Sequence, residues 1–294
     1  MAEETLLVYA TANLRTEIRE IGGGYRWLHS SGWQNPNNLP EPPAYVHRAV
    51  STINVPRARF VLPTYTDGVL AFDLPGPVSL GWRLLSGAVE PSSAVDALRA
   101  VGSALHALHR SVPEELGPVP RLAGLRRWLA DGDGPQDAPF LHTVVAEALG
   151  DRRMADLLTW CEDLVAQGPR ARLVHGGMSL NHVVIDPESE QAHIPIGLGV
   201  GAGSPVIDLA RIVAEVPAYR QVGALVGRSE LDLRALTEAF LDGYGTSVDD
   251  VELAKAVAVT TVLGLHSIAA HIGWKELIHG RVDELAQLVD GALR

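Results

Sequence analysis

The chain has 294 residues, 47% of them apolar, and its formal net charge at pH 7 is −11. A chain of this length and composition can bury a full core, either in two lobes or in one large domain. The negative charge disfavours nucleic acid and anionic membrane surfaces as main partners, because both repel an acidic protein.

The sequence contains one cysteine, Cys161, which excludes an internal disulfide and fits a reducing cytoplasm. Its N-terminal segment is acidic and lacks the basic start of a signal peptide. No apolar run reaches the length of about 18 residues that a membrane span requires. We therefore expect a cytoplasmic protein that does not bind a membrane.

Residues 1–78 are predicted to form a small, mostly β lobe. Alternating or β-rich segments predict strands at 5–10, 16–21, 25–28, 60–62 and 69–74. The last two would form a hairpin around the turn Thr66-Asp67-Gly68, and a helix is expected at 44–53. The triplet Gly22-Gly23-Gly24 is interpreted as a hairpin turn, because no lysine follows it as in a phosphate-binding loop.

Residues 79–294 are predicted to form a larger helical lobe. A helix at 94–109, capped by Ser92 or Ser93, would place His106 and His109 on one face as a structural pair. Apolar residues at helical spacing predict further helices at 122–130, 141–149, 154–165, 207–215 and 231–244. Two or three more are expected after residue 250, and the apolar run 256–272 should be buried between other helices.

The stretch 173–210 is the most informative part of the chain. It combines a strand end, a polar loop at 175–182, hairpin strands at 183–185 and 192–196, a glycine-rich loop and a helix start. Such an arrangement is typical of catalytic groups held on a rigid base. Three alternatives rest on proximity alone: a metal site at His175, His182 and His193, a hydrolase using Ser179, and a thiol enzyme using Cys161.

The polar loop resembles the catalytic loop of the aminoglycoside phosphotransferase and choline kinase-like family. In that family the loop reads His-Gly-Asp and ends in Asn five residues after the Asp. The Asp orients the acceptor hydroxyl of the substrate, and the Asn binds Mg²⁺. Here His175 and Gly176 match, the Asp position holds Gly177, and the Asn position holds His182, with Asn181 one place early.

A second motif of the family, an Asp between an apolar and an aromatic residue, also lacks its carboxylate. That metal-binding Asp would fall on Pro195 or Ile196. The structural end of the motif is retained in Gly203-Ser204-Pro205 and Asp208-Leu209-Ala210. The resemblance therefore implies structural roles, with His175 bonding the backbone across the loop and Asp208 capping the helix that follows.

The segment Leu74-Pro75-Gly76 resembles the hinge of the family, whose backbone binds adenine. The family also uses a lysine on a strand of the small lobe to bind the ATP phosphates, and residues 1–254 contain no lysine. Arg19 and Arg26 are the candidates to replace it.

The resemblance implies a two-lobed kinase-like α+β fold with lobes at 1–78 and 79–294. Because the catalytic and metal positions have lost their residues, we expect a pseudokinase with no catalytic residues, no metal and no cofactor, neither ATP nor Mg²⁺. It would act as a binding or partner subunit for a protein or peptide, in bacterial biosynthesis such as that of modified peptides. The alternative is an active ATP-dependent phosphotransferase that uses other residues on a peptide Ser/Thr or a small-molecule hydroxyl.

Overall fold

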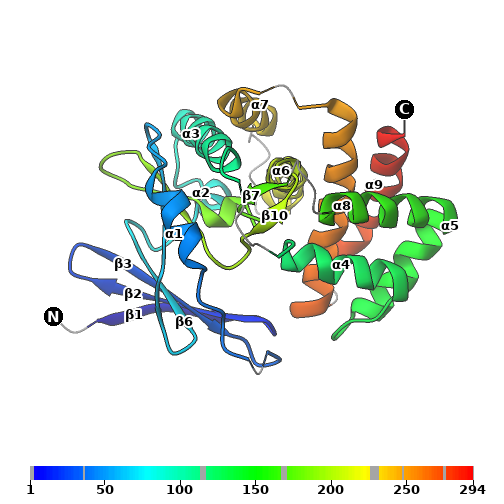
Figure 1. Cartoon of the computed structure of the whole chain (residues 1–294), viewed down its shortest axis with the longest axis horizontal. Helices are drawn as coiled ribbons and strands as arrows, with labels where there is room; N and C mark the ends of the chain where they lie inside the picture. Colours follow the sequence, from blue (N-terminus) through cyan, green and yellow to red (C-terminus); the bar gives the residue numbers. More distant parts are fainter. Residues whose placement is uncertain are drawn as a thin grey trace. The chain divides into compact units, whose positions relative to one another are not determined.

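The computed structural model describes residues 3–35, 37–112, 117–166, 171–225, 232–246, 248–273 and 276–293. A β-sheet part at the N-terminal end is followed by a larger helical part, which confirms the predicted α+β organisation (Figure 1). The chain divides into two compact units. The first comprises 1–111, 178–200 and 215–246, and the second comprises 112–177, 201–214 and 247–294. The lobe boundary expected after residue 78 stays a prediction.

The first unit contains a five-stranded antiparallel sheet with the strand order β1-β2-β3-β6-β5. Its strands are β1 (Glu4–Ala10), β2 (Leu14–Ile21), β3 (Gly24–Ser31), β5 (Thr64–Thr66) and β6 (Val69–Leu74). Figure 1 shows β1, β2 and β3 side by side, in chain order. As predicted, the glycine triplet forms the turn between β2 and β3, where Gly23 has a left-handed φ of 97°.

One face of this sheet is apolar, because alternate side chains of a strand point to the same side. Ile18, Trp27 and Phe72 lie opposite one another on β2, β3 and β6, and all three are buried. The same cluster includes Leu39, Leu70, Leu74 and Val184. Burial of each large apolar side chain stabilises the sheet by roughly 1.5–3 kcal/mol.

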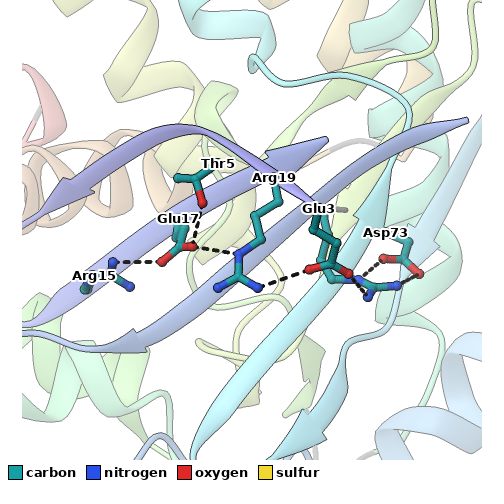
Figure 2. A network of polar contacts seen from close by, with 7 residues as sticks. Glu3, Thr5, Arg15, Glu17, Arg19 and Asp73 are labelled. Atoms are coloured by element: carbon teal, nitrogen blue, oxygen red, sulfur yellow. Dashed lines mark hydrogen bonds and ion pairs between the residues drawn. The ribbon is translucent and has the colours of Figure 1, made fainter. Parts of the chain in front are cut away.

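The other face carries a chain of ion pairs (Figure 2). Glu17 on β2 contacts Arg15 at 2.8 Å and Arg19 at 2.7 Å. Glu3 contacts Arg19 at 3.1 Å and Arg26 at 3.0 Å, which links β2 to β3. These pairs are partly exposed and each contributes little, but together they neutralise a row of arginines on this face.

A separate three-stranded sheet contains β4 (Ala58–Val61), β8 (Val184–Ile185) and β9 (Ala192–Pro195). The predicted hairpin of β8 and β9 is confirmed. The predicted hairpin of 60–62 with 69–74 is wrong, because β4 pairs in parallel with β9, and β6 pairs with β5. Local alternation of residues identifies a strand, but it cannot identify a partner so far along the chain.

The first unit also contains the helices α1 (Ala44–Ser51), α2 (Leu80–Ser86), α3 (Pro91–His109) and α7 (Leu233–Tyr244), and the 3₁₀ helix η1 (Leu180–His182). The predicted cap of α3 by Ser92 or Ser93 is wrong. The helix begins at Pro91, whose fixed φ suits a first helical position. The predicted structural histidine pair is confirmed, since His109 bonds Tyr244 at 3.0 Å and His106 bonds Thr246 at 2.9 Å.

The second unit is mostly helical. Its elements are α4 (Pro120–Asp131), α5 (Ala138–Val165), α8 (Asp250–His271), α9 (Glu276–Ala292), the strands β7 (Arg172–Val174) and β10 (Gly201–Gly203), and the start of α6 (Val206–Leu225). The helices predicted at 141–149 and 154–165 join across Gly150, which has a non-helical φ of 71°. Side chains of α4, α5, α8 and α9 share one buried apolar core.

Among the described helices, α8 is long and apolar enough to cross a membrane, with a mean hydropathy of 1.5 in its most apolar window. More than half of that window, 56%, is buried inside the protein, where α8 contacts α5 and α9. The predicted burial of the apolar run 256–272 is therefore confirmed for the residues of α8, such as Val259, Val262 and Ala269. A cytoplasmic location stays a prediction.

Replacing Gly102 by alanine should destabilise the packing of α3 against α7. A Cβ on Gly102 would lie 2.2 Å from the carbonyl oxygen of Phe240, so the two helices must separate. We expect Gly102→Ala to lower the free energy of unfolding by about 1–3 kcal/mol, measured by urea denaturation.

Gly124→Ala in α4 is the matched control, because nothing lies within 4 Å of a Cβ at that position. Alanine is the better helix former, so this change should raise the free energy of unfolding by up to about 1 kcal/mol. Equal effects of the two substitutions would contradict the close contact of α3 and α7.

Stability should fall with pH below about 6.5, the ordinary pKa of histidine, because of His29. This side chain is buried on β3, with its Nδ1 3.0 Å from the Thr16 hydroxyl, and burial lowers its pKa to about 4. Between pH 6.5 and 4 the unfolded chain takes up a proton that the folded chain refuses, so His29 contributes a loss of about 1.4 kcal/mol per pH unit. Urea denaturation at several pH values gives the free energy of unfolding as a function of pH. Between pH 6.5 and 4 this free energy should fall less steeply for His29→Gln, which cannot titrate, than for the unchanged protein. Identical pH dependence of the two would contradict the role of His29.

Candidate functional site

The candidate site consists of the polar loop 175–182 and the residues that hold it. The division between the two compact units falls inside this loop, after Gly177. The part up to Gly177 therefore belongs to the second unit, and the part from Met178 onward belongs to the first.

In the second unit, Asp208 holds the loop through two backbone amides. The N–H of His175 donates to Oδ2 of Asp208 at 2.7 Å, and the N–H of Gly176 donates to Oδ1 at 2.8 Å. The carboxylate is completely buried, and a buried charge is stable only where such donors replace its lost hydration. Gly176 adopts a left-handed φ of 68° between the two amides, which costs a glycine little.

The predicted role of Asp208 as a helix cap is wrong. A cap residue precedes the first turn of the helix and accepts from the amides of that turn. α6 begins at Val206, so Asp208 lies inside the first turn, and its side chain accepts from the loop. The predicted role of His175 is confirmed, since its Nδ1 accepts the backbone N–H of Gly177 at 3.3 Å.

Gly177 occupies the position of the family's catalytic Asp, and a cation lies beside it. A Cβ at Gly177 would be 3.6 Å from Nη1 of Arg121 and 3.9 Å from Nδ1 of His175, which are ordinary van der Waals distances. Arg121 is exposed to solvent; desolvation by neighbouring protein atoms, and then repulsion from Arg211, lower its pKa to about 10. Arg121 thus stays protonated at neutral pH and cannot act as a base there.

In the first unit, Glu215 holds the continuation of the loop. The hydroxyl of Ser179 donates to Oε1 of Glu215 at 2.9 Å, and the N–H of Leu180 donates to Oε2 at 2.8 Å. Glu215 was not among the predicted site residues, because nothing in a helix sequence marks a carboxylate that bonds a loop 35 residues away. The only available signal was an acidic residue at the end of the predicted helix 207–215.

Asn181 lies one place before the position of the family's metal-binding Asn. Its amide oxygen accepts from the hydroxyls of Ser79 at 3.0 Å and Tyr219 at 3.2 Å. Gly81 permits this approach, since a Cβ there would be 2.1 Å from the Tyr219 oxygen. Burial raises the pKa of Tyr219, and the charge of Glu215 raises it further, so the phenol stays a donor. The oxygen that could bind a metal is already bonded by two hydroxyls.

The remaining positions of the family motifs lie in structural elements. His182 ends η1, and its backbone N–H donates to the carbonyl of Ser179 at 2.9 Å. Pro195 is the last residue of β9, and Ile196 extends the pairing with β4 by donating to the carbonyl of Val61 at 3.0 Å. Both positions of the second motif are thus buried parts of a sheet.

Within the described part of the chain, no group of three or more His, Cys, Asp and Glu side chains could hold a metal ion. His193 is buried on β9 with the guanidinium of Arg59 3.3 Å from its Nδ1, and burial lowers its pKa to about 4. The positive charge of Arg59 beside His193 disfavours the binding of a metal cation there. The absence of a metal stays a prediction.

The two nucleophile alternatives find no support in the geometry. The hydroxyl of Ser179 donates to a carboxylate of Glu215, with no histidine described between them. Cys161 is buried in the second unit, and burial raises the pKa of its thiol to about 12, which makes it unreactive.

The hinge-like segment follows directly after β6. Leu74 is the last residue of that strand, and Pro75 has no N–H to donate. The carbonyl of Gly76 accepts the indole N–H of Trp27 at 3.0 Å, and a Cβ on Gly76 would lie 3.3 Å from Val184. Trp27 was not among the predicted site residues, because its sequence context indicates only a strand.

Arg19 and Arg26 do not reach this segment from the apolar face. Arg26 pairs across the sheet with Arg19 on one side and Asp73 on the other, whereas its neighbour Trp27 points to the opposite face. Arg26 binds both oxygens of Asp73, at 2.7 and 3.2 Å (Figure 2). Both arginines thus have carboxylate partners on the face opposite Trp27, and replacement of the missing lysine by either of them stays a prediction.

Asp208→Ala should destabilise the protein by about 2–5 kcal/mol, because it leaves two buried amides without an acceptor. Asp208→Asn keeps one acceptor oxygen and should lower the free energy of unfolding by less than Asp208→Ala. Chemical denaturation of both variants measures this free energy.

Asp186→Ala is the matched control. Asp186 also accepts two backbone amides, those of Glu188 at 2.9 Å and Ser189 at 3.4 Å, but in an exposed turn where water can replace it. Its loss should cost about 1 kcal/mol or less. If Asp208→Ala costs no more than this control, the buried carboxylate does not hold the loop.

Similarity to known proteins was found by comparison of structures and not by comparison of sequences. No family model matches the sequence, and no curated protein matches it. Among solved structures, spectinomycin phosphotransferase APH(9)-Ia in complex with ADP and spectinomycin has a TM-score of 0.57 at 12% identity, covering 100% of this chain and 92% of that one. Choline kinase LicA from Streptococcus pneumoniae has a TM-score of 0.55 at 12% identity, covering 99% and 94%. The streptomycin–ATP complex of APH(2")-IIa has a TM-score of 0.53 at 10% identity, covering 98% and 91%.

These comparisons contradict the expectation that no cofactor, neither ATP nor Mg²⁺, is used. Structures of this fold contain ADP in one case and ATP in another. The expectation was inferred from missing metal ligands, but a nucleotide is also held by its base and sugar, which do not depend on those residues. At these identities the comparisons establish one property of the chain: it has the two-lobed kinase-like fold of aminoglycoside phosphotransferases and choline kinase.

Proposed function

We propose that this protein is a pseudokinase that binds a nucleotide at the segment Leu74–Gly76 and does not transfer its phosphate. It acts as a binding or partner subunit for a protein or peptide, in a bacterial biosynthetic pathway such as that of modified peptides. The net charge of −11 supports a partner segment that is basic.

The observation that supports the loss of catalysis is how the carboxylates at the loop are used. Asp208 bonds two loop amides, and Glu215 bonds the Ser179 hydroxyl and the Leu180 amide. A general base must be free to accept the proton of the substrate hydroxyl. Two side chains lie next to Gly177: the guanidinium of Arg121, which carries donors only, and His175, whose Nδ1 already accepts the Gly177 N–H.

Nucleotide binding is supported by the fold and by the shape of the segment after β6. Solved structures of this fold contain ADP and ATP. Between β6 and α2, the segment Leu74–Gly76 offers backbone groups at the edge of the apolar cluster of Trp27 and Val184. An apolar surface with a few backbone polar groups is the usual setting for a flat base.

An active phosphotransferase on a peptide Ser/Thr or a small-molecule hydroxyl is the second candidate, and Glu215 is the observation that favours it. Its carboxylate already accepts a serine hydroxyl, that of Ser179 at 2.9 Å. A substrate hydroxyl that displaced Ser179 would meet an acceptor in the same place. This candidate predicts that catalysis depends on Glu215.

The protein should show no ATP turnover above background in a coupled assay of ADP release, with aminoglycosides, choline or serine-containing basic peptides as acceptors. Loss of a general base alone costs about two to four orders of magnitude in rate. ADP should nevertheless raise the melting temperature, because the proposal retains nucleotide binding.

Gly177→Asp and Glu215→Gln are the diagnostic variants. Gly177→Asp should fold, since a Cβ at this position meets its neighbours at ordinary distances. It should stay inactive because we expect its carboxylate to pair with Arg121. If the unchanged protein turns over ATP and Glu215→Gln does not, the pseudokinase proposal is wrong and the active phosphotransferase is the function. Absence of any ADP-dependent melting shift would refute the nucleotide site.

A further inference from the structure

The strongest unexplained contact in the first unit joins Trp27 to the hinge-like segment. Trp27 is 5% exposed, and its Nε1–H donates to the carbonyl of Gly76 at 3.0 Å. On the sheet it lies between Ile18 of β2 and Phe72 of β6, and its cluster includes Val184 of β8. The largest side chain of this face therefore covers the segment where the proposed function places a nucleotide base.

We propose that Trp27 is a gate for that site and selects the base that opens it. This inference rests on the proposed nucleotide site at Leu74–Gly76. In the closed form the indole covers the apolar surface, and its N–H donates to the Gly76 carbonyl. In the open form the indole no longer contacts the apolar surface or the Gly76 carbonyl, and a base binds in its place.

The contacts at Gly76 define what can replace the indole. Gly76 lies after β6, so its carbonyl is outside the pairing of β6 with β3, which ends at Leu74 opposite Tyr25. Pro75 supplies no N–H beside it. Removal of the indole leaves a buried carbonyl that requires a donor, because an unpaired buried acceptor is costly. A purine with an exocyclic amine supplies that donor and a flat apolar ring together.

The packing around the indole makes the exchange all-or-none, because Trp27 is buried between Ile18 and Phe72. A Cβ on Gly76 would lie 3.3 Å from Val184 Cγ1, so the segment already rests on β8. Two aromatic ring systems cannot share this layer, and the base must displace the indole rather than stack on it. Only molecules in the open form can bind the base. The apparent affinity of the unchanged protein for the base is therefore lower than that of the open form, in proportion to the fraction of open molecules.

The test measures adenosine binding by isothermal titration to the full chain and to two variants. Trp27→Phe keeps an aromatic ring of smaller size and removes the N–H donor. Trp82→Phe is the matched control, because Trp82 lies on α2 in the same unit and is 60% exposed. Purine riboside, which lacks the amine, is the control ligand.

We expect Trp27→Phe to bind adenosine at least about tenfold more tightly than the unchanged protein, and Trp82→Phe to bind it equally. The gain should be smaller for purine riboside, which cannot donate to Gly76. A second measurement uses the unchanged protein alone, so it does not depend on the folding of a variant. The indole N–H signal of Trp27, identified by its absence in Trp27→Phe, should be protected from hydrogen exchange without ligand and exchange faster with saturating adenosine.

Two outcomes would overturn the gate and leave the nucleotide site in place. One is equal adenosine affinity of Trp27→Phe and the unchanged protein. The other is an indole N–H that stays protected when adenosine is bound. If neither protein binds adenosine while circular dichroism shows both folded, the proposed nucleotide site fails, and the gate fails with it.

Discussion

The buried carboxylate of Asp208 is the constraint on which the central loop depends. It has no exposure to solvent, and the amides of His175 and Gly176 compensate its charge. Any rearrangement of the loop would leave a buried anion and two buried donors unpaired, at a cost that few local gains can offset. The loop backbone is therefore fixed by an interaction that involves no substrate, and Gly177 could lose a carboxylate without loss of the loop.

In the first unit, the carboxylate of Glu215 holds the continuation of the loop by hydrogen bonds, as Asp208 does in the second unit. It fixes Ser179 and Leu180, while Asn181 is held by the hydroxyls of Ser79 and Tyr219. In an enzyme, polar groups of such a loop must keep free lone pairs for a metal or a substrate proton. Here the side chains of His175, Ser179 and Asn181 each bond another group of their own unit, so structural bonds already use these polar groups of the loop.

The sequence predicted the elements well where local periodicity carries the information. The helices of the second unit and most strands between Thr5 and Leu74 follow from helical spacing and alternation, and the loop from His175 follows from a motif. β5 (Thr64–Thr66) was not predicted, because its residues were assigned to the connection and turn before β6. It failed where a contact joins distant segments. β4 pairs with β9, Asp208 bonds a loop instead of its helix, and Trp27 bonds Gly76 across 49 residues. No local pattern encodes such a partner, because side-chain type fixes what a residue can bond but not which residue the fold brings to it.

The same limit explains why the expected absence of a cofactor was wrong. A kinase-like fold holds a nucleotide at several places, and the sequence showed the loss of only the phosphate and metal positions. The base position depends on backbone groups, which every sequence has, and on the size of the side chain that covers them. At that place this chain has Trp27, a residue large enough to fill the layer and polar enough to satisfy the Gly76 carbonyl. Gly177 and Trp27 lie in different units, so a change at one position does not require a change at the other. If a base displaced the indole, the packing of β3 against β6 and β8 would change without any reaction at the phosphates, because Trp27 lies between Ile18 and Phe72 and its cluster includes Val184.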